Sequence, residues 1–219
     1  MNVYFISGLG ADKRAFERIH LSDKYSIHHL PWITPQKNEP LSSYARRLSA
    51  PIDITKPFVL VGLSMGGMMA AAMNDFMQPQ KTVLISSAAS ALELPAYFRW
   101  CGRLGLHNLI PTGLMNKPNS IAFWMFGAKS EAEKKLMRLI IKEGDAAFIK
   151  WGIGAILTWK GEQKSKNIFH IHGEADKILP VRFTKPDAVI KGGSHFMVWM
   201  KAGEVSRLLQ KALDSCQAV

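Results

Sequence analysis

The chain has 219 residues, of which 47% are hydrophobic and 21% are charged, with a formal net charge of +11. This length and composition fit one globular domain with a large core and exclude a disordered chain. Cys101 and Cys216 are far apart in the sequence and follow no metal-ligand spacing. We therefore expect neither a disulfide framework nor a metal site.

Three explanations of the positive charge are open. The Lys and Arg residues are scattered along the chain without a nucleic-acid-binding motif, so we expect no nucleic-acid partner. An anionic substrate or an acidic partner is a second explanation. The third, which we favour, is a solvated basic surface that aids solubility.

The chain enters an apolar run at residues 2–6 without a basic leader or a cleavage site, which indicates a cytoplasmic protein. Short apolar runs at 2–6, 25–30, 58–61 and 81–86 predict strands, and helical patterns lie between them, including one at 41–48. Strands that alternate with helices predict a parallel sheet with helices on both faces.

A glycine pair follows the first expected strand, in Gly8-Leu9-Gly10. The third glycine position of a dinucleotide fingerprint is Lys13, and no acidic residue ends a second strand at the required distance. We therefore expect no nucleotide cofactor. The segment is either a plain glycine turn or a loop that lies close to the end of the third strand.

That third strand runs into Gly62-Leu63-Ser64-Met65-Gly66, the G-x-S-x-G pattern of a nucleophile elbow. A strand that turns directly into a helix holds the turn residue at φ > 0 and requires small residues two positions before and after it. We therefore expect Ser64 to lie at the tip of the turn, at a helix N-terminus whose free N–H groups stabilise an anion. The alternative is a helix N-cap in a glycine-rich turn.

From about residue 91 to 166 the chain shows helical patterns and almost no strand signal. Ser130-Glu131-Ala132-Glu133 predicts a capping box, and Gly144 suits the end of that helix. We interpret 91–166 as a helical insertion over the carboxyl edge of the sheet. The segment is rich in aromatic residues, which either line an apolar pocket or hold the insertion together; they are Tyr97, Phe98, Trp100, Phe123, Trp124, Phe126, Phe148, Trp151 and Trp159.

The sheet resumes at 167–172 and ends with a strand at 188–190. His172-Gly173-Glu174-Ala175-Asp176 follows the first of these strands, and Gly193-Ser194-His195-Phe196 follows the second. A closing helix has the spacing of a core-facing stripe, formed by Val205, Leu208, Leu209, Ala212 and Leu213.

These three motifs, in the order Ser, Asp, His and each after an expected strand, resemble the α/β-hydrolase family with a helical cap. The likeness covers essentially the whole chain. It implies a mostly parallel sheet with helices on both faces, a core formed by 1–90 and 167–219, and a cap at 91–166 inserted before the last two strands.

The resemblance implies a catalytic triad of Ser64, Asp176 and His195, and an oxyanion hole formed by the backbone N–H groups of Leu9 and Met65. His195 would take the Ser64 proton as a neutral base, while Asp176 fixes its tautomer. Gly62 and Gly66 would be the elbow glycines. Glu174 is the competitor of Asp176, and we expect His170 and His172 to be core histidines. Many relatives have His-Gly where this chain has Ser7-Gly8.

We therefore expect a serine hydrolase of the carboxylesterase or thioesterase type, without a cofactor or a metal, acting through an acyl-enzyme on Ser64. The aromatic, Met-rich insertion predicts a small-molecule substrate with an apolar acyl or aryl group. A carbon–carbon lyase or synthase with His195 as base, and a non-catalytic binding protein, remain alternatives. No membrane span is expected, and the sequence leaves the natural substrate and the oligomeric state open.

Overall fold

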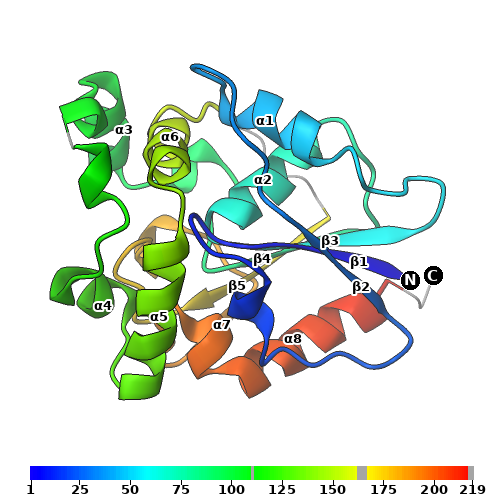
Figure 1. Cartoon of the computed structure of the whole chain (residues 1–219). Helices are drawn as coiled ribbons and strands as arrows, with labels where there is room; N and C mark the ends of the chain where they lie inside the picture. The colour runs from blue at the N-terminus through cyan, green and yellow to red at the C-terminus, as the bar shows by residue number, and fades with distance from the viewer. Residues whose placement is uncertain (110, 162–166, 217–219) are drawn as a thin grey trace.

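The computed structural model of the chain describes residues 1–109, 111–161 and 167–216. At its centre is a six-stranded parallel sheet with the order β2-β1-β3-β4-β5-β6 (Figure 1). All the strands occur where the sequence predicts them, within two residues at each end. Their bounds are β1 Asn2–Ile6, β2 Ser26–Leu30, β3 Phe58–Leu63, β4 Lys81–Ile85, β5 Ile168–Gly173 and β6 Ala188–Ile190.

The central strands are buried on both faces, which explains why their sequences are continuously apolar rather than alternating. In β1, Tyr4 and Ile6 contribute to one core cluster, whereas Val3 and Phe5 contribute to the other. The sheet therefore separates two hydrophobic cores, and every strand ends at the same edge because all the pairings are parallel.

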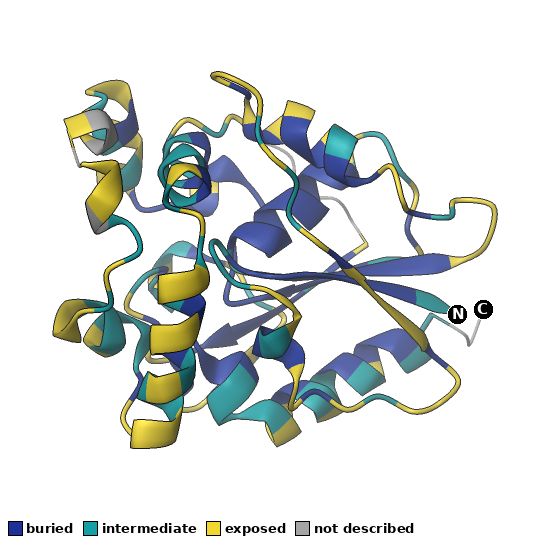
Figure 2. Ribbon diagram, in the orientation of Figure 1, coloured by how far each residue is buried: buried dark blue, intermediate teal, exposed yellow. Residues whose placement is uncertain are grey.

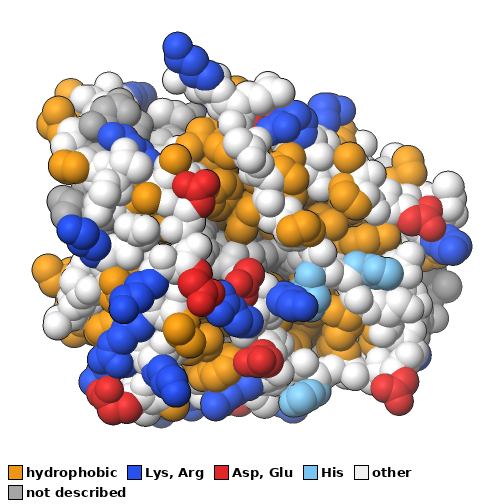
Figure 3. Space-filling view, in the orientation of Figure 1, with side chains coloured by type: hydrophobic (Ala, Val, Ile, Leu, Met, Phe, Trp, Pro, Cys, Tyr) orange, Lys and Arg blue, Asp and Glu red, His pale blue; other side chains and the backbone are white. Residues whose placement is uncertain are grey.

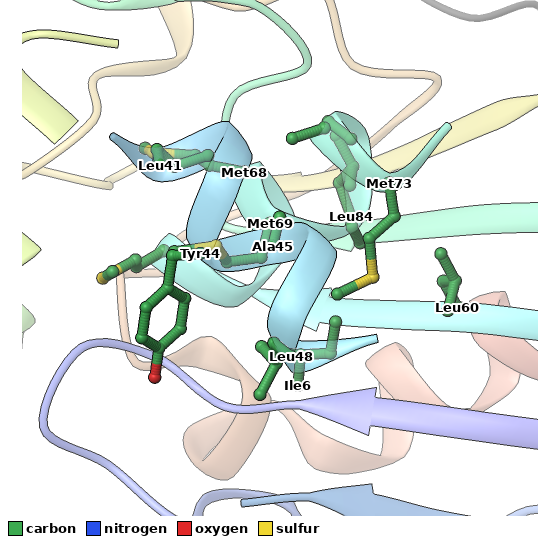
Figure 4. Packing of buried hydrophobic residues seen from close by; sticks show 14 of the residues in the cluster. Ile6, Leu41, Tyr44, Ala45, Leu48, Leu60, Met68, Met69, Met73 and Leu84 are labelled. Carbon is green, nitrogen blue, oxygen red and sulfur yellow. The ribbon is translucent and has the colours of Figure 1, made fainter. Parts of the chain in front are cut away.

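Helices α1 (Leu41–Leu48) and α2 (Met65–Met73) cover one face of the sheet. Figure 4 shows Leu48 of α1 beside Ile6 of β1, and Met73 of α2 pointing toward Leu60 of β3; Tyr44 belongs to the same core cluster. Every residue of α2 is buried. This burial on all sides explains why α2 is uniformly apolar, since it lies between α1 and the sheet.

The opposite face carries the short helix η1 (Lys13–Phe16) and the helices α7 (Met197–Met200) and α8 (Ala202–Asp214). The predicted stripe of α8 faces the sheet, with Leu208 half-buried at its margin and the other members buried. Figure 2 shows the resulting pattern, in which the central strands are buried, the edge strand β2 is largely exposed, and the outer helices expose one side.

Between β4 and β5 the described residues form helices and no strand. These helices lie beyond the carboxyl ends of the strands (Figure 1). Ile110 and 162–166 of the expected 91–166 insertion lie outside the described residues. The helices are η2 Ala91–Glu93, α3 Ala96–Arg103, η3 Leu106–Leu109, η4 Thr112–Leu114, α4 Ser120–Phe126, α5 Glu131–Glu143 and α6 Ala146–Leu157; a last short helix, η5 (Val181–Phe183), follows β5.

The predicted capping box begins α5, since the Ser130 hydroxyl accepts from the Glu133 amide and the Glu133 carboxylate accepts from the Ser130 amide. Gly144 ends this helix as expected, but its backbone is extended (φ −63°, ψ 136°) rather than left-handed. The reason is that Asp145 follows at once as the N-cap of α6. Across the part of the chain that the structure describes, no helix is both long and apolar enough to cross a bilayer.

Candidate active site

Ser64 lies at the tip of the turn between β3 and α2, with φ 51° and ψ −120°. This positive φ is the strained conformation that the sequence predicts for the turn residue. Two neighbouring segments fix it in place. The Ser64 amide donates to the Ile85 carbonyl over 2.9 Å, and the Ser64 carbonyl accepts from the Ser87 hydroxyl over 2.6 Å. Both partners lie at the end of β4.

The glycines around the turn are required by close backbone contacts. A Cβ on Gly62 would lie 2.3 Å from the Gly66 carbonyl oxygen, and a Cβ on Gly66 would lie 2.2 Å from the Ile6 carbonyl oxygen. A third glycine is closely approached by a side chain rather than by backbone, since a Cβ on Gly67 would lie 2.4 Å from the Ser87 hydroxyl. Sequence reasoning missed Gly67, because its neighbour Ser87 is twenty residues away in the chain.

Ser64, His195 and Asp176 are connected by two successive side-chain hydrogen bonds. The Nε2 atom of His195 is 2.9 Å from the Ser64 hydroxyl, and its Nδ1 atom is 2.7 Å from the Oδ2 atom of Asp176. His195 and Asp176 are buried, whereas Ser64 is half-exposed. Because a carboxylate only accepts, Nδ1 donates to Asp176 and Nε2 is left to accept from the Ser64 hydroxyl.

A backbone hydrogen bond joins the loop that carries Asp176 to the loop that carries His195. The Ala175 amide donates to the Gly193 carbonyl over 2.8 Å. The other carboxylate oxygen of Asp176, Oδ1, accepts from the amides of Ile178 and Leu179. The amides of its own turn therefore orient the Asp176 carboxylate, independently of its hydrogen bond to the imidazole.

Burial alone would raise the pKa of Asp176. The neighbouring His195 imidazole and the Leu179 amide outweigh that burial, so that the pKa lies below its ordinary value. Asp176 is therefore an anion at neutral pH, as an acceptor for His195 must be. Glu174, its competitor in the sequence, is exposed and accepts instead from the Gly192 amide over 2.9 Å.

His172 lies beneath this carboxylate and is fully buried. Its Nε2 atom donates to the Leu179 carbonyl over 2.7 Å, and its Nδ1 atom is 2.9 Å from Nε2 of His170. Desolvation lowers the pKa of His172, which keeps the ring neutral. Both histidines are part of the core, as the sequence predicts.

The loop after β1 lies against Ser64, since a Cβ on Gly8 would be 3.5 Å from the Ser64 Cβ. Leu9 follows in this loop, and Met65 begins α2. Neither the Leu9 nor the Met65 amide donates a hydrogen bond to any described residue. Two N–H groups near Ser64 are therefore free of a partner among the described residues, one in the loop that lies against Ser64 and one on the residue after it.

Residues outside the sequence motifs fix the shape of this loop. The Trp32 indole N–H donates to the carbonyls of Gly8 (3.2 Å) and Ala11 (3.0 Å). The Ser7 hydroxyl, at the position where many relatives have histidine, donates to the same Ala11 carbonyl over 2.7 Å. Trp32 was missed in the sequence because it lies in a Pro-rich loop without a recognisable spacing.

The inserted helices contribute apolar groups near Ser64. The Phe126 ring lies edge-on to His195, with centroids 5.4 Å apart. Helix α6 passes so close to the loop after β1 that a Cβ on Gly152 would lie 2.4 Å from the Leu9 side chain and 3.1 Å from the Met65 sulfur. Phe126 and Gly152 carry no motif, and only their positions in space bring them to the site.

The aromatic residues of this segment occupy three kinds of position, of which two were expected from the sequence. Phe148 and Trp151 hold α6 on the core by packing against Tyr44, and Phe126 contacts the candidate site. Tyr97 and Trp124 are exposed instead. Within the described ranges, no group of three or more His, Cys, Asp or Glu side chains is arranged to hold a metal ion.

No family model matches this sequence, and no curated protein does so either. Solved structures do match its fold. A thermophilic esterase from Thermogutta terrifontis matches 99% of this chain and 90% of its own at 16% identity, with a TM-score of 0.72. MenH from S. aureus matches 99% and 94% at 14% identity, with a TM-score of 0.74. A lipase-esterase related protein from Clostridium acetobutylicum matches 96% and 93% at 14% identity, with a TM-score of 0.69.

The chain has the α/β-hydrolase fold. Its six parallel strands and its helices on both faces agree with these structures over nearly their full length.

In this α/β-hydrolase fold, the candidate site is built entirely at the carboxyl edge of the sheet. Leu9 follows β1, Ser64 follows β3, Ser87 follows β4, Asp176 follows β5 and His195 follows β6. In an open parallel sheet this edge is where ligands bind, because the loops that leave the strands converge there.

Proposed function

We propose that the chain is a serine hydrolase that cleaves a carboxylic ester or thioester through an acyl-enzyme on Ser64. The observation that carries this proposal is the hydrogen-bonded line from Asp176 through His195 to the Ser64 hydroxyl, at the tip of a strained turn. A serine hydroxyl is a weak nucleophile, and a neutral imidazole at this distance is the base that activates it.

In the first step, Ser64 Oγ attacks the substrate carbonyl carbon while its proton passes to His195 Nε2. The carbonyl electron pair moves onto oxygen, and the free amides of Leu9 and Met65 donate to that oxyanion. One such donor contributes about 3–4 kcal/mol of transition-state stabilisation. Asp176, held as an anion, stabilises the imidazolium that forms.

In the second step, the oxyanion collapses, the bond to the leaving group breaks, and His195 returns the proton to that group. The product is an ester of Ser64. Water then attacks this acyl-enzyme with His195 again as base, and the carboxylic acid leaves with Ser64 restored.

The inserted segment 91–166 is proposed to act as a cap that binds the acyl or aryl part of a small substrate. Phe126 beside His195, and the Leu9 and Met65 side chains under Gly152, offer apolar contacts to such a group. The esterase and the lipase-esterase related protein among the structures of similar fold support ester chemistry.

The experiment is labelling with a fluorophosphonate probe and intact-mass readout, on wild type, Ser64→Ala and the control Ser43→Ala. Ser43 is an exposed serine of α1. We expect one adduct on wild type and Ser43→Ala, mapped to Ser64, and none on Ser64→Ala. Turnover of nitrophenyl esters and acyl thioesters of increasing chain length then identifies the bond and the acyl group. A folded wild type that takes no adduct, or an adduct that persists in Ser64→Ala, contradicts the proposal.

A further inference from the structure

Exposed hydrophobic side chains are concentrated in the inserted helices. Among the described residues, nine of the twelve large hydrophobic side chains that are exposed lie between 91 and 139. The five most exposed of those in the stretch from α3 to α4 are Trp100 (62%), Leu104 (66%), Leu109 (78%), Ile121 (70%) and Trp124 (63%), of which Leu104 directly follows α3. A soluble monomer rarely gathers so many apolar side chains in one region without a partner.

Helix α3 has an inner face that packs on α6 and an outer face with exposed apolar side chains. Gly102 packs inward, where a Cβ would lie 2.2 Å from the Leu157 carbonyl oxygen of α6. Tyr97, Trp100 and Leu104 are exposed and follow the i, i+3, i+7 spacing of a single helix face. The packing of α3 on α6 therefore explains the inner face. On the outer face the Tyr97 ring lies edge-on to Phe183, with centroids 6.5 Å apart, while Trp100 and Leu104 stay exposed to solvent.

Helix α4 repeats this arrangement. Ile121 and Trp124 are exposed and one turn apart, whereas Phe126, near the end of the same helix, turns inward to His195. In Figure 1, α3 and α4 lie at one end of the molecule, beyond the carboxyl ends of the strands, and the N-terminus lies at the opposite end.

The charged residues of the segment from α3 to α4 are all basic. Residues 96–129 contain no Asp or Glu, and Glu93, just before them, is buried and accepts from the Ala89 amide. Lys177, from the turn after β5, places its ammonium 3.8 Å from the centre of the Trp124 ring. Figure 3 shows hydrophobic and basic side chains together at this end. The basic residues of the segment are all exposed; they are Arg99, Arg103, Lys117 and Lys129.

We propose that α3, η3 and α4 form a docking surface for an anionic phospholipid bilayer. Exposed Trp, Tyr, Leu and Ile side chains interleaved with Arg and Lys are what inserts at the level of lipid headgroups, where apolar groups enter the acyl boundary and cations meet the phosphates. A second copy of this chain would instead bring two surfaces of equal positive charge together. Docking by this end places the carboxyl edge of the sheet, and Ser64 with it, toward the membrane.

The test is flotation with vesicles of phosphatidylcholine alone and of phosphatidylcholine with 30% phosphatidylglycerol, at low and high salt. Wild type is expected to float with the anionic vesicles and to be released by salt. The variants Trp100→Ser/Trp124→Ser and Arg103→Glu/Lys117→Glu are each expected to bind about tenfold more weakly or worse.

Matched controls come from the opposite end of the sheet. Ile54, which is 69% exposed, and Lys56 both precede β3, and Ile54→Ser and Lys56→Glu should bind like wild type. Ser64→Ala should also bind like wild type, so that docking and hydrolysis are tested separately. Thermal melts verify that each variant is folded.

Wild type that floats with neither vesicle overturns the proposal, as does binding that the surface variants leave unchanged. A wild-type dimer in sedimentation equilibrium that Trp100→Ser/Trp124→Ser dissociates, without vesicle binding, would assign this surface to contact between copies and likewise overturn it.

Discussion

Gly66 lies directly against Ile6, the last residue of β1, so that a Cβ on Gly66 would stand 2.2 Å from the Ile6 carbonyl oxygen and 2.3 Å from that of Ser7. The first turn of α2 thus rests on the backbone that leads into the loop of Gly8 and Leu9. One contact between two backbones sets how far Ser64 lies from the amides of that loop.

Gly66→Ala should therefore destabilise the protein strongly. The added methyl group meets backbone, which cannot move aside as a flexible side chain would, and we expect the free energy of unfolding to fall by about 2–3 kcal/mol or more. Gly203→Ala is the control, because a Cβ at this α8 position meets nothing within 4 Å, and its effect should stay within about 0.5 kcal/mol. Urea unfolding measures both. Equal stability of the two variants would mean that the close contact is absent.

Asp176→Asn should lower kcat/KM by about 10³–10⁴-fold with little change in the melting temperature. The amide nitrogen of asparagine presents a donor to Nδ1 of His195, so that the ring adopts the tautomer that cannot accept the Ser64 proton. Glu174→Gln is the matched control, since this carboxylate is exposed and contacts the Gly192 amide instead. Its kcat/KM should remain within about threefold of wild type. If Glu174→Gln proved the more damaging change, the assignment of Asp176 would be wrong.

Trp32→Phe should lower kcat by about 5–30-fold while leaving KM nearly unchanged. The variant keeps an aromatic ring but loses the N–H that donates to Gly8 and Ala11, and so loosens the loop that carries the Leu9 amide. Trp151→Phe is the comparison, because it also removes an indole N–H, but one that donates to the Glu39 carbonyl rather than to a carbonyl of that loop. A similar loss of kcat in both variants would point to general loosening of the fold.

The stability of the protein should fall as the pH drops below about 6.5, the ordinary pKa of histidine in an unfolded chain. Desolvation lowers the pKa of His172 in the folded state. Between the folded and unfolded pKa values the unfolded chain binds more protons, so the free energy of unfolding decreases as the pH falls. Asp176 adds its own loss of stability only below about pH 4, because its folded-state pKa is also lowered.

Urea unfolding between pH 7.5 and 5, on wild type and His172→Asn, measures this effect. The variant should show a shallower dependence of unfolding free energy on pH, whatever its absolute stability. His29→Gln is a useful comparison, since desolvation also lowers the pKa of His29. Parallel pH profiles for wild type and His172→Asn would refute the buried, neutral His172.

The backbone conformation at the site depends largely on residues that are close in the sequence, so it could be predicted. A short apolar run at the centre of a parallel sheet is buried on both faces, so the strands are readable from composition alone. The strain at Ser64 and the need for Gly62 and Gly66 follow from a strand that turns directly into a helix. The need for glycine at Gly67 was not predicted, because Ser87, the residue in contact with it, follows a different strand.

The sequence by itself determined the order of the strands along the chain, the strained turn at Ser64, and the loops in which Asp176 and His195 lie, since each depends on neighbours a few residues away. Only the tertiary structure decided that Asp176 rather than Glu174 meets His195, that Trp32 holds the loop of Leu9, and that Trp100 and Trp124 point outward. Those outcomes depend on how separate strands and helices pack, and an aromatic residue has the same sequence signature whether it faces a core, a substrate or the surface.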